Sequence, residues 1–362
     1  MSRVGIIGCG STGLALAAHL MQRGVTVQSM VDQSHALLVR LRQSRKISLT
    51  GLLGAGDYPP PLYTDDYASL VGCDVIFVAT TADRHFSVAR LLGPVLQPGQ
   101  LCVLATGYVN GAAAFASALS SAGAAVAEES VVALNTTPHL SYAPGDGRVH
   151  IAAIKTWFEV SAATQAASKE AAARLSPWFP AATPARHQLA SSLNNPNPIA
   201  HVPAAVLNAV PASREAHGLV APFGAFHLGD FGAPALEALR NVLDAERLAV
   251  MRALGLGAHH VGRNDFGLRA YGPGARETDP PRVGPTFQRR FVTEDVPCGL
   301  VPIESLGQWT GVQTPSISAL ISLICALEGR DFRVHPAVWP RLVGWPGAGR
   351  ARQPVREGAA LT

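Results

Sequence analysis

The chain has 362 residues, of which 48% are hydrophobic and 15% are charged, and this balance excludes a disordered protein. Lys and Arg number 29 against 25 acidic residues, so the formal net charge is only +4. A charge this small on a chain this long gives no electrostatic footprint for nucleic acid. No apolar run reaches the roughly 18 residues of a membrane span. We therefore expect neither nucleic acid nor membrane as a partner.

The cysteines and histidines give no metal or redox pattern. No two of the five cysteines are closer than 27 positions, which excludes CxxC motifs, and the odd count argues against a disulfide framework. Histidines such as His259 and His260 lack the spacing to Cys or carboxylates that metal sites have, so we expect no metal. The first residues lead straight into an apolar run and a glycine loop, with no signal peptide pattern. We expect a cytoplasmic protein.

The first half of the chain alternates short apolar runs with helical stretches. The expected strands are 3–8, 25–31, 74–79, 101–106, 124–127 and 150–154. The expected helices are 11–23, 83–92, 111–122 and 163–175. Strands that alternate with helices predict βαβ units in a parallel sheet.

After about residue 185 the pattern becomes helical. Residues 233–254 place leucines on one face, and Thr314-Pro315 opens a helix with 3–4 residue apolar spacing that ends at Gly329. We therefore predict a doubly wound α/β domain over residues 1–186 and an all-α domain over 187–343. Residues 344–362, rich in Gly, Pro, Arg and Ala, are interpreted as a flexible tail.

A glycine loop lies between the first strand and the first helix. Gly8, Gly10 and Gly13 form GxGxxG, in which the glycines allow a tight turn, approach of a pyrophosphate and close helix–sheet packing. The helix begins at Ser11 and Thr12, where backbone N–H groups and the helix dipole favour a phosphate. This context predicts a Rossmann domain that binds NAD or NADP.

The end of the second strand bears on the choice of cofactor. Asp32 is 19 residues beyond Gly13, where an acid would bind ribose hydroxyls and repel a 2′-phosphate. This favours NAD, although Asp32 could equally cap the next helix, and NADP stays open. Thr80 and Thr81 follow the strand at 74–79 and are expected to line the cofactor.

Three further motifs follow the glycine loop in a fixed order. They are Asn195-x-Asn197-Pro198-x-x-His201, Arg290-x-x-x-Glu294-Asp295-Val296-Pro297-x-Gly299-Leu300-Val301 and Gly311-Val312-x-Thr314-Pro315. Together with the glycine loop they resemble the octopine/nopaline (opine) dehydrogenase family over nearly the whole chain. The resemblance implies a Rossmann domain followed by an all-α domain. It also implies reductive condensation of an amino-acid amine with a 2-oxo acid, using NADH or NADPH.

The resemblance assigns three roles. It makes His201 and Asp295 the pair that handles the proton, and it places Arg290 by the carboxylate of the oxo acid. These roles fit the chemistry, because a hydride delivered to carbon needs a proton for the neighbouring oxygen or nitrogen, and His titrates near neutral pH. An ionised Asp fixes the imidazole tautomer, and a guanidinium grips a carboxylate. A structural role for His201, and Arg289 in place of Arg290, are the alternatives.

Substrate contacts are less clear from the sequence. The family carries Glu-Thr and a Pro-aromatic element near the amine substrate; Glu128 matches the Glu, while the Pro-aromatic element is missing there. Tyr108 stands in a changed turn after the fourth main strand, and Cys298 replaces the usual Tyr of Val-Pro-Tyr-Gly. We expect Glu128, Tyr108 and Asn197 to contact substrate, and Glu128 could instead cap a loop.

Three functions remain open at this stage. The first is an opine-type dehydrogenase with a 2-oxo acid and an amine as its small-molecule substrates. The second is a simple reductase of 2-oxo or 3-oxo acids, for which the same His, Asp and Arg would serve. The third is a dinucleotide sensor without catalysis, against which the His–Asp pair argues. A homodimer is left open.

Overall fold

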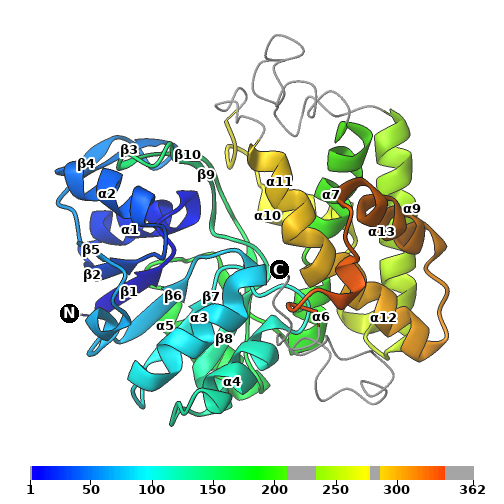
Figure 1. Cartoon of the computed structure of the whole chain (residues 1–362), viewed down its shortest axis with the longest axis horizontal. Helices are drawn as coiled ribbons and strands as arrows, with labels where there is room; N and C mark the ends of the chain where they lie inside the picture. Colours follow the sequence, from blue (N-terminus) through cyan, green and yellow to red (C-terminus); the bar gives the residue numbers. More distant parts are fainter. Residues whose placement is uncertain (1, 210–233, 278–285, 339–362) are drawn as a thin grey trace, which may run out of the picture.

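The protein was analysed as a computed structural model that describes residues 2–209, 234–277 and 286–338 (Figure 1). Figure 1 shows a half built from strands and helices on the left and a half built from helices on the right. The predicted fold class, a Rossmann-type domain followed by an all-α domain, is confirmed. The predicted tail, 344–362, lies outside the described residues. None of the described helices combines the length and apolarity needed to cross a membrane.

The main sheet has eight strands, six of them parallel. In spatial order the parallel strands are β5 (Leu62–Thr64), β2 (Thr26–Val31), β1 (Arg3–Ile7), β6 (Val75–Val78), β7 (Leu101–Leu104) and β8 (Val131–Leu134). β11 (Phe158–Ser161) pairs antiparallel with β8, and β12 (Ala182–Pro184) continues parallel to β11. All four residues of β6, β7 and β8 are buried, as expected of strands covered on both faces.

Two strand predictions need correction. Residues 124–127 form no strand, and the strand of that unit is β8, seven positions later. The Ala-rich segment has weak strand propensity, whereas Val131 and Val132 are β-branched and fit a buried strand. Residues 150–154 do form a strand, but in a second sheet.

The second sheet packs against the first helix of the Rossmann domain, on the side away from the main sheet. Its order is β4 (Gly56–Tyr58), β3 (Ile47–Gly51), β10 (Arg148–Ile154) and β9 (His139–Tyr142). Helix α1 (Ser11–Gln22) lies between the two sheets, so residues Gly13 to Leu20 are all buried. α2 (His35–Gln43) follows β2. The core on this face includes α1, both sheets and α5 (Gln165–Leu175).

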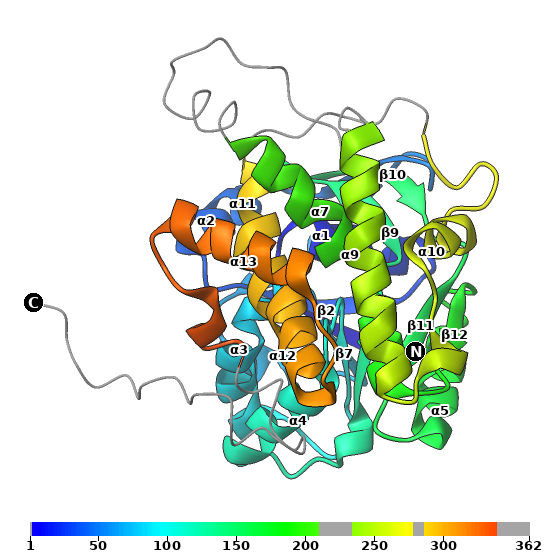
Figure 2. The same cartoon turned by 90° about the vertical axis from the view of Figure 1, so that its right-hand side faces the viewer.

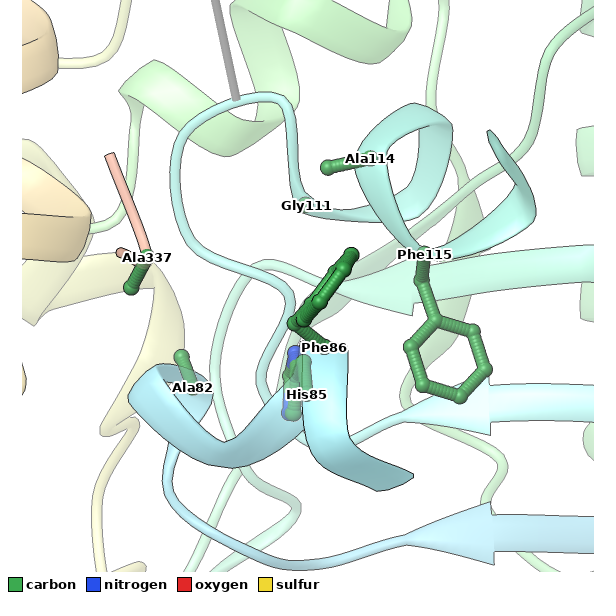
Figure 3. Close-up of a pocket in the computed structure, with 7 residues that line it drawn as sticks. All are labelled: Ala82, His85, Phe86, Gly111, Ala114, Phe115 and Ala337. Atoms are coloured by element: carbon green, nitrogen blue, oxygen red, sulfur yellow. The ribbon is translucent and has the colours of Figure 1, made fainter. Parts of the chain in front are cut away.

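The other face of the main sheet is covered by α3 (His85–Leu92) and α4 (Gly111–Ser121). A small cavity lies where the start of α3, α4 and Ala337 meet (Figure 3). Its volume of about 20 Å³ and its mainly apolar wall leave room for little more than a water molecule, so it is not a substrate site.

The helical domain surrounds a second core. Its described helices are α6 (Gln188–Leu193), α7 (Asn197–Leu207), α9 (Pro234–Ala253), α10 (Arg263–Ala270), α11 (Thr286–Thr293), α12 (Val301–Thr310) and α13 (Pro315–Glu328). α7 and α9 lie side by side (Figure 2). Arg247 is 1% exposed; it pairs with Asp244 on the same helix and joins α9 to its surroundings through the carbonyls of Leu193 and Val261. The predicted helix from Pro315 to Gly329 is confirmed, with Gly329 as its left-handed C-cap.

Candidate active site

The glycine loop joins β1 to α1 as predicted. Gly8 has φ +101°, and a Cβ there would lie 2.8 Å from backbone atoms of Ala79 and Thr80. A Cβ on Gly13 would lie 1.9 Å from the carbonyl oxygen of Gly8. A Cβ on Gly10 would meet nothing within 4 Å. Gly8 and Gly13 are therefore required by the fold, whereas the space beside Gly10 is open for a ligand.

A cavity of about 400 Å³ opens at this loop, at the carboxyl ends of β1, β6 and β7. That edge of a doubly wound sheet is the usual ligand site. The Rossmann domain contributes Gly10, Ser11, Thr12, Ala79, Thr80, Thr81, Ala105, Thr106 and residues 137 and 139–143 to its wall. The helical domain contributes Asn197, Arg290 and Glu294. The cavity therefore lies between the two domains.

The predicted cofactor residues Ser11, Thr12, Thr80 and Thr81 all line this cavity. The hydroxyl of Ser11 accepts a hydrogen bond from the backbone N–H of Ala143. Thr80 Oγ1 is buried and has no hydrogen-bond partner among the described residues. An open cradle at a helix N-terminus and an unpartnered hydroxyl fit a nicotinamide dinucleotide.

Asp32 lies behind the glycine loop rather than in the cavity wall. Its carboxylate accepts hydrogen bonds from the backbone N–H of Cys9 at 2.7 Å and of Ser34 at 2.8 Å. The N-cap of α2 is Ser34, whose hydroxyl accepts from Leu37 N–H, so Asp32 is not the helix cap. Asp32 thus holds the glycine loop against the start of α2.

His201 and Asp295 are brought together as the sequence suggested. The imidazole Nδ1 lies 3.0 Å from Oδ2 of Asp295, and the two residues are 7% and 0% exposed. The proline-rich segment around His201 is helical: α7 begins at Asn197 and continues past Pro203. Asn197 lies one helical turn before His201 and reaches the cavity wall.

The ring of His201 is stacked on Phe291, with centroids 4.1 Å apart. Burial lowers the pKa of His201 below its ordinary value, while the Asp295 carboxylate acts in the opposite direction. A buried imidazole beside a carboxylate can give up and regain a proton near neutral pH. With Nδ1 directed at Asp295, the exchangeable proton belongs to Nε2.

Arg290 and Asp295 lie on a helical segment of the chain. α11 carries Arg290 and leads into a π-helical turn, Val296–Leu300, directly after Asp295. Arg290 lines the cavity with its side chain 38% exposed. Helical spacing pairs Arg290 with Glu294, the neighbour of Asp295, and π-helical turns often occur at functional sites.

Glu294 is a site residue that the motif contained but the sequence analysis did not assign. It lines the cavity at 3% exposure. Its carboxylate accepts from Nη1 of Arg290 at 2.8 Å and from the backbone N–H of Ala82 at 2.7 Å. Burial raises the pKa of Glu294, and the Arg290 guanidinium opposes this. The sequence feature that could have identified Glu294 is its position four residues after Arg290, the spacing at which an acid and an arginine pair on a helix.

The structure gives Tyr108, which was predicted to contact substrate, a protein partner instead, the buried carboxylate of Asp295. Tyr108 is 2% exposed and is not part of the cavity wall; its hydroxyl donates to Oδ1 of Asp295 at 2.5 Å. It lies in the loop between β7 and α4, in the Rossmann domain. Tyr108 therefore contacts Asp295 of the His201–Asp295 pair from the Rossmann domain.

The structure places Glu128, the other predicted substrate contact, away from the cavity. Glu128 is exposed and precedes β8, at the opposite edge of the sheet from the cavity. The carboxyl end of β8 leads instead to Thr137, Pro138 and His139, and Thr137 and His139 line the cavity. A correct position for β8 would have directed attention to this segment.

No group of three or more metal-binding side chains occurs within the ranges that the structure describes. The site instead combines a dinucleotide cradle, a buried His–Asp pair and a cavity-lining Arg. These features define an NAD(P)-dependent oxidoreductase.

The comparisons with known proteins agree with this class. A family model for the α-helical domain of NAD/NADP octopine/nopaline dehydrogenase matches residues 184–328, and one for ketopantoate reductase PanE/ApbA matches residues 4–165. An opine dehydrogenase from Arthrobacter sp. (strain 1C) is 29% identical over 339 residues, 91% of each chain. The chain is thus similar to members of the octopine/nopaline dehydrogenase family along nearly its whole length, and these comparisons support an NAD(P)-dependent oxidoreductase of the opine dehydrogenase type.

Two solved structures share the fold. Octopine dehydrogenase with NADH and pyruvate has a TM-score of 0.66 and 18% identity, covering 90% of this chain and 89% of its own. Yersinopine dehydrogenase with NADP⁺ bound has a TM-score of 0.63 and 15% identity, covering 97% of both chains. Nicotinamide dinucleotides of both kinds thus occur among proteins of this fold.

Proposed function

We propose that the protein reductively condenses the amine of an amino acid, or another amine, with a 2-oxo acid and also catalyses the reverse reaction. The carbonyl oxygen leaves as water, and the product is a secondary amine in which the former keto carbon carries the amine nitrogen, the hydrogen delivered as hydride and the carboxylate. The observation that carries this proposal is the buried His201–Asp295 pair beside a cavity that both domains line. The similarity to the octopine/nopaline dehydrogenase family supports the same chemistry.

Each site residue has a defined task in this proposal. Gly10, Ser11 and Thr12 at the start of α1 would hold the pyrophosphate, and Thr80 the nicotinamide side. When bound, the reduced dinucleotide supplies the hydride. His201 donates the proton that the reduction requires, from Nε2, and Asp295 holds the tautomer and stabilises the imidazolium.

Arg290 binds the carboxylate of the 2-oxo acid. Nη1 is engaged by Glu294, which leaves the rest of the guanidinium fork for a substrate in the cavity. Because Glu294 also accepts from Ala82 N–H, Arg290 is fixed relative to the loop after β6. This arrangement orients the keto carbon toward the face where the nicotinamide binds.

The wall formed by Thr137 and His139 is where we place the amine substrate. It faces the cavity from β9 and the preceding loop, opposite the helical domain's Asn197 and Arg290. Burial lowers the pKa of His139 well below its usual range, so this wall is uncharged at neutral pH. An uncharged wall accommodates a neutral amine, the form that attacks a carbonyl.

We favour NAD over NADP as the cofactor. Asp32 ends β2 beside the glycine loop, where a carboxylate disfavours a 2′-phosphate. Calorimetry with NADH and NADPH tests this, because NADH should bind more tightly and Asp32→Ser should reduce the difference. Equal affinities in the wild-type protein would remove the preference.

The alternative is a reductase that acts on the 2-oxo or 3-oxo acid alone. The match of residues 4–165 to the ketopantoate reductase model favours this second candidate. Oxidation of the reduced cofactor, followed by absorbance, separates the two. The proposal expects turnover with pyruvate, 2-oxoglutarate or glyoxylate only when an amine is also present. Turnover with the oxo acid alone, unchanged by any amine, would support the alternative, and tight cofactor binding without turnover would support a sensor.

A further inference from the structure

The carboxylate of Asp295 receives hydrogen bonds from both domains. Its Oδ2 faces His201 Nδ1 in the helical domain, and its Oδ1 accepts the hydroxyl proton of Tyr108 in the Rossmann domain. Tyr108 and Asp295 are 187 positions apart in the sequence. The O–H···O distance of 2.5 Å is at the short end for a bond to an ionised carboxylate.

The loop that carries Tyr108 is held firmly. Tyr108 has φ +54°, a left-handed conformation that is unusual for a bulky residue. Gly107 N–H donates to the carbonyl of Leu134, and Val109 N–H donates to the carbonyl of Cys298. A Cβ on Gly107 would lie 2.3 Å from Cβ of Ala133, so the loop lies tightly against β8.

The space around the phenol ring is made by small side chains. Tyr108 forms a buried cluster with Ala82, Cys298 and Ala337, each at most 6% exposed. Cys298 stands three residues after Asp295 in the π-helical turn. A larger side chain at 298 would compete with the ring of Tyr108 for this space. The sequence thus makes room for a tyrosine that reaches Asp295 from the other domain.

Tyr108 can only donate to this carboxylate. Burial and the negative charges of Asp295 and Glu294 raise the pKa of its phenol well above the ordinary value, so it stays protonated. A donor on Oδ1 compensates a carboxylate that has no access to water. It also draws negative charge away from the oxygen that faces His201 and so weakens the hold of Asp295 on the imidazolium proton.

We propose that Tyr108 is a positioning residue that acts through Asp295, fixing the carboxylate and setting how readily His201 releases its proton. This inference rests on the proposed acid–base role of His201. The buried hydroxyl of Tyr108 is engaged by Asp295, so Tyr108 acts on the proton transfer through that carboxylate. It also ties the catalytic pair to the domain that holds the cofactor.

The test measures the pKa of His201 by NMR on the full-length protein with ¹³C-labelled histidine. His201→Asn identifies the signal among the 12 histidines. Tyr108→Phe should raise the pKa of His201 by about half a unit or more, because the carboxylate regains its full charge. Turnover should fall roughly 10-fold, with Michaelis constants changed less than about twofold.

Two further measurements keep the inference falsifiable. Tyr63→Phe is the matched control, because Tyr63 is 4% exposed and its hydroxyl has no partner among the described residues; it should leave the pKa of His201 unchanged. Incorporation of 3-fluorotyrosine, which keeps the ring but makes a stronger donor, should lower the pKa of His201. If Tyr108→Phe does not fold, the protein with 3-fluorotyrosine still tests the effect of this hydrogen bond on the pKa of His201.

An unchanged or lowered pKa of His201 in folded Tyr108→Phe would overturn the inference, as would an unchanged or raised pKa with 3-fluorotyrosine. Because this readout needs no substrate, it is independent of the proposed reaction. If the protein joins no amine to an oxo acid, the reaction fails while the link from Tyr108 to His201 can still be established.

Discussion

Glu294 of the helical domain accepts a hydrogen bond from the backbone N–H of Ala82, 212 positions earlier in the chain, at 2.7 Å. The same carboxylate holds Arg290 at 2.8 Å. Glu294, which orients the proposed substrate ligand Arg290, is therefore also attached to the loop on which the cofactor is expected to lie. Loss of this acid should affect substrate binding without removing any group that reacts.

Arg290→Lys keeps the charge but loses the planar fork. We expect it to raise the Michaelis constant for the 2-oxo acid more than that for the amine or the cofactor. Arg290→Ala should raise it roughly 10- to 100-fold, the effect of a lost charged hydrogen bond. Glu294→Gln should also raise the Michaelis constant for the 2-oxo acid. Arg148→Lys, which alters a surface ion pair with Asp146, should leave all three Michaelis constants unchanged. An Arg290→Ala enzyme impaired only toward the amine would assign the arginine to the other substrate.

Gly10→Val should abolish dinucleotide binding in a folded protein, because the branched side chain would occupy the open space where the pyrophosphate binds. Gly13→Ala is the contrasting variant. Its Cβ would collide with the carbonyl of Gly8, so it should lower the free energy of unfolding by roughly 1–3 kcal/mol. Calorimetric titration and urea unfolding distinguish the two effects. Unchanged affinity in Gly10→Val would remove the glycine loop from the cofactor site.

His201→Ala should lower turnover about 10²- to 10⁴-fold while cofactor affinity is preserved, which is the usual contribution of a positioned acid–base group. Asp295→Asn should also reduce turnover strongly, because the amide can hold the wrong imidazole tautomer. Steady-state kinetics together with calorimetry check both variants. Near-normal turnover without His201 would place the proton donor elsewhere.

A buried histidine pair predicts a loss of stability in acid. His19 Nδ1 lies 2.7 Å from His139 Nε2, and burial lowers the pKa of His19 to about 4. In the unfolded chain a histidine takes up a proton near pH 6.5, whereas the folded protein keeps His19 neutral down to about pH 4. The contribution of neutral His19 to the free energy of unfolding is therefore complete above pH 6.5 and is lost as the pH falls toward 4. Between these values the free energy of unfolding should fall by roughly 3 kcal/mol through His19 alone, and protonation of His139 acts in the same direction. Urea unfolding of His19→Gln should show a weaker pH dependence; an identical slope would contradict this origin.

The parts of the site that lie in local motifs could be predicted from the sequence. The glycine loop is encoded by spacing within six residues, and the residues of the His201–Asp295 pair stand in recognisable motifs. The helix from Pro315 to Gly329 carries both its start and stop signals. In each case local backbone chemistry leaves little choice.

The remaining errors have tertiary causes. The position of β8 was misjudged because four small apolar residues, 124–127, resemble a strand until Val131–Leu134 is seen to complete the sheet. That shift explains both the placement of Glu128 away from the cavity and the missed His139. The role of Tyr108 depends on a contact with Asp295 across the domain boundary, which no local pattern contains.

The central claim is the formation of a carbon–nitrogen bond during reduction, and one labelling experiment tests it directly. The full-length protein is incubated with a ¹⁵N-amine, a 2-oxo acid and reduced cofactor carrying deuterium at both nicotinamide C4 positions, and the products are weighed by mass spectrometry. The account predicts a secondary amine that contains ¹⁵N and one deuterium on the carbon next to the carboxylate. A deuterated 2-hydroxy acid without ¹⁵N, as the product in the presence of amine, would contradict it.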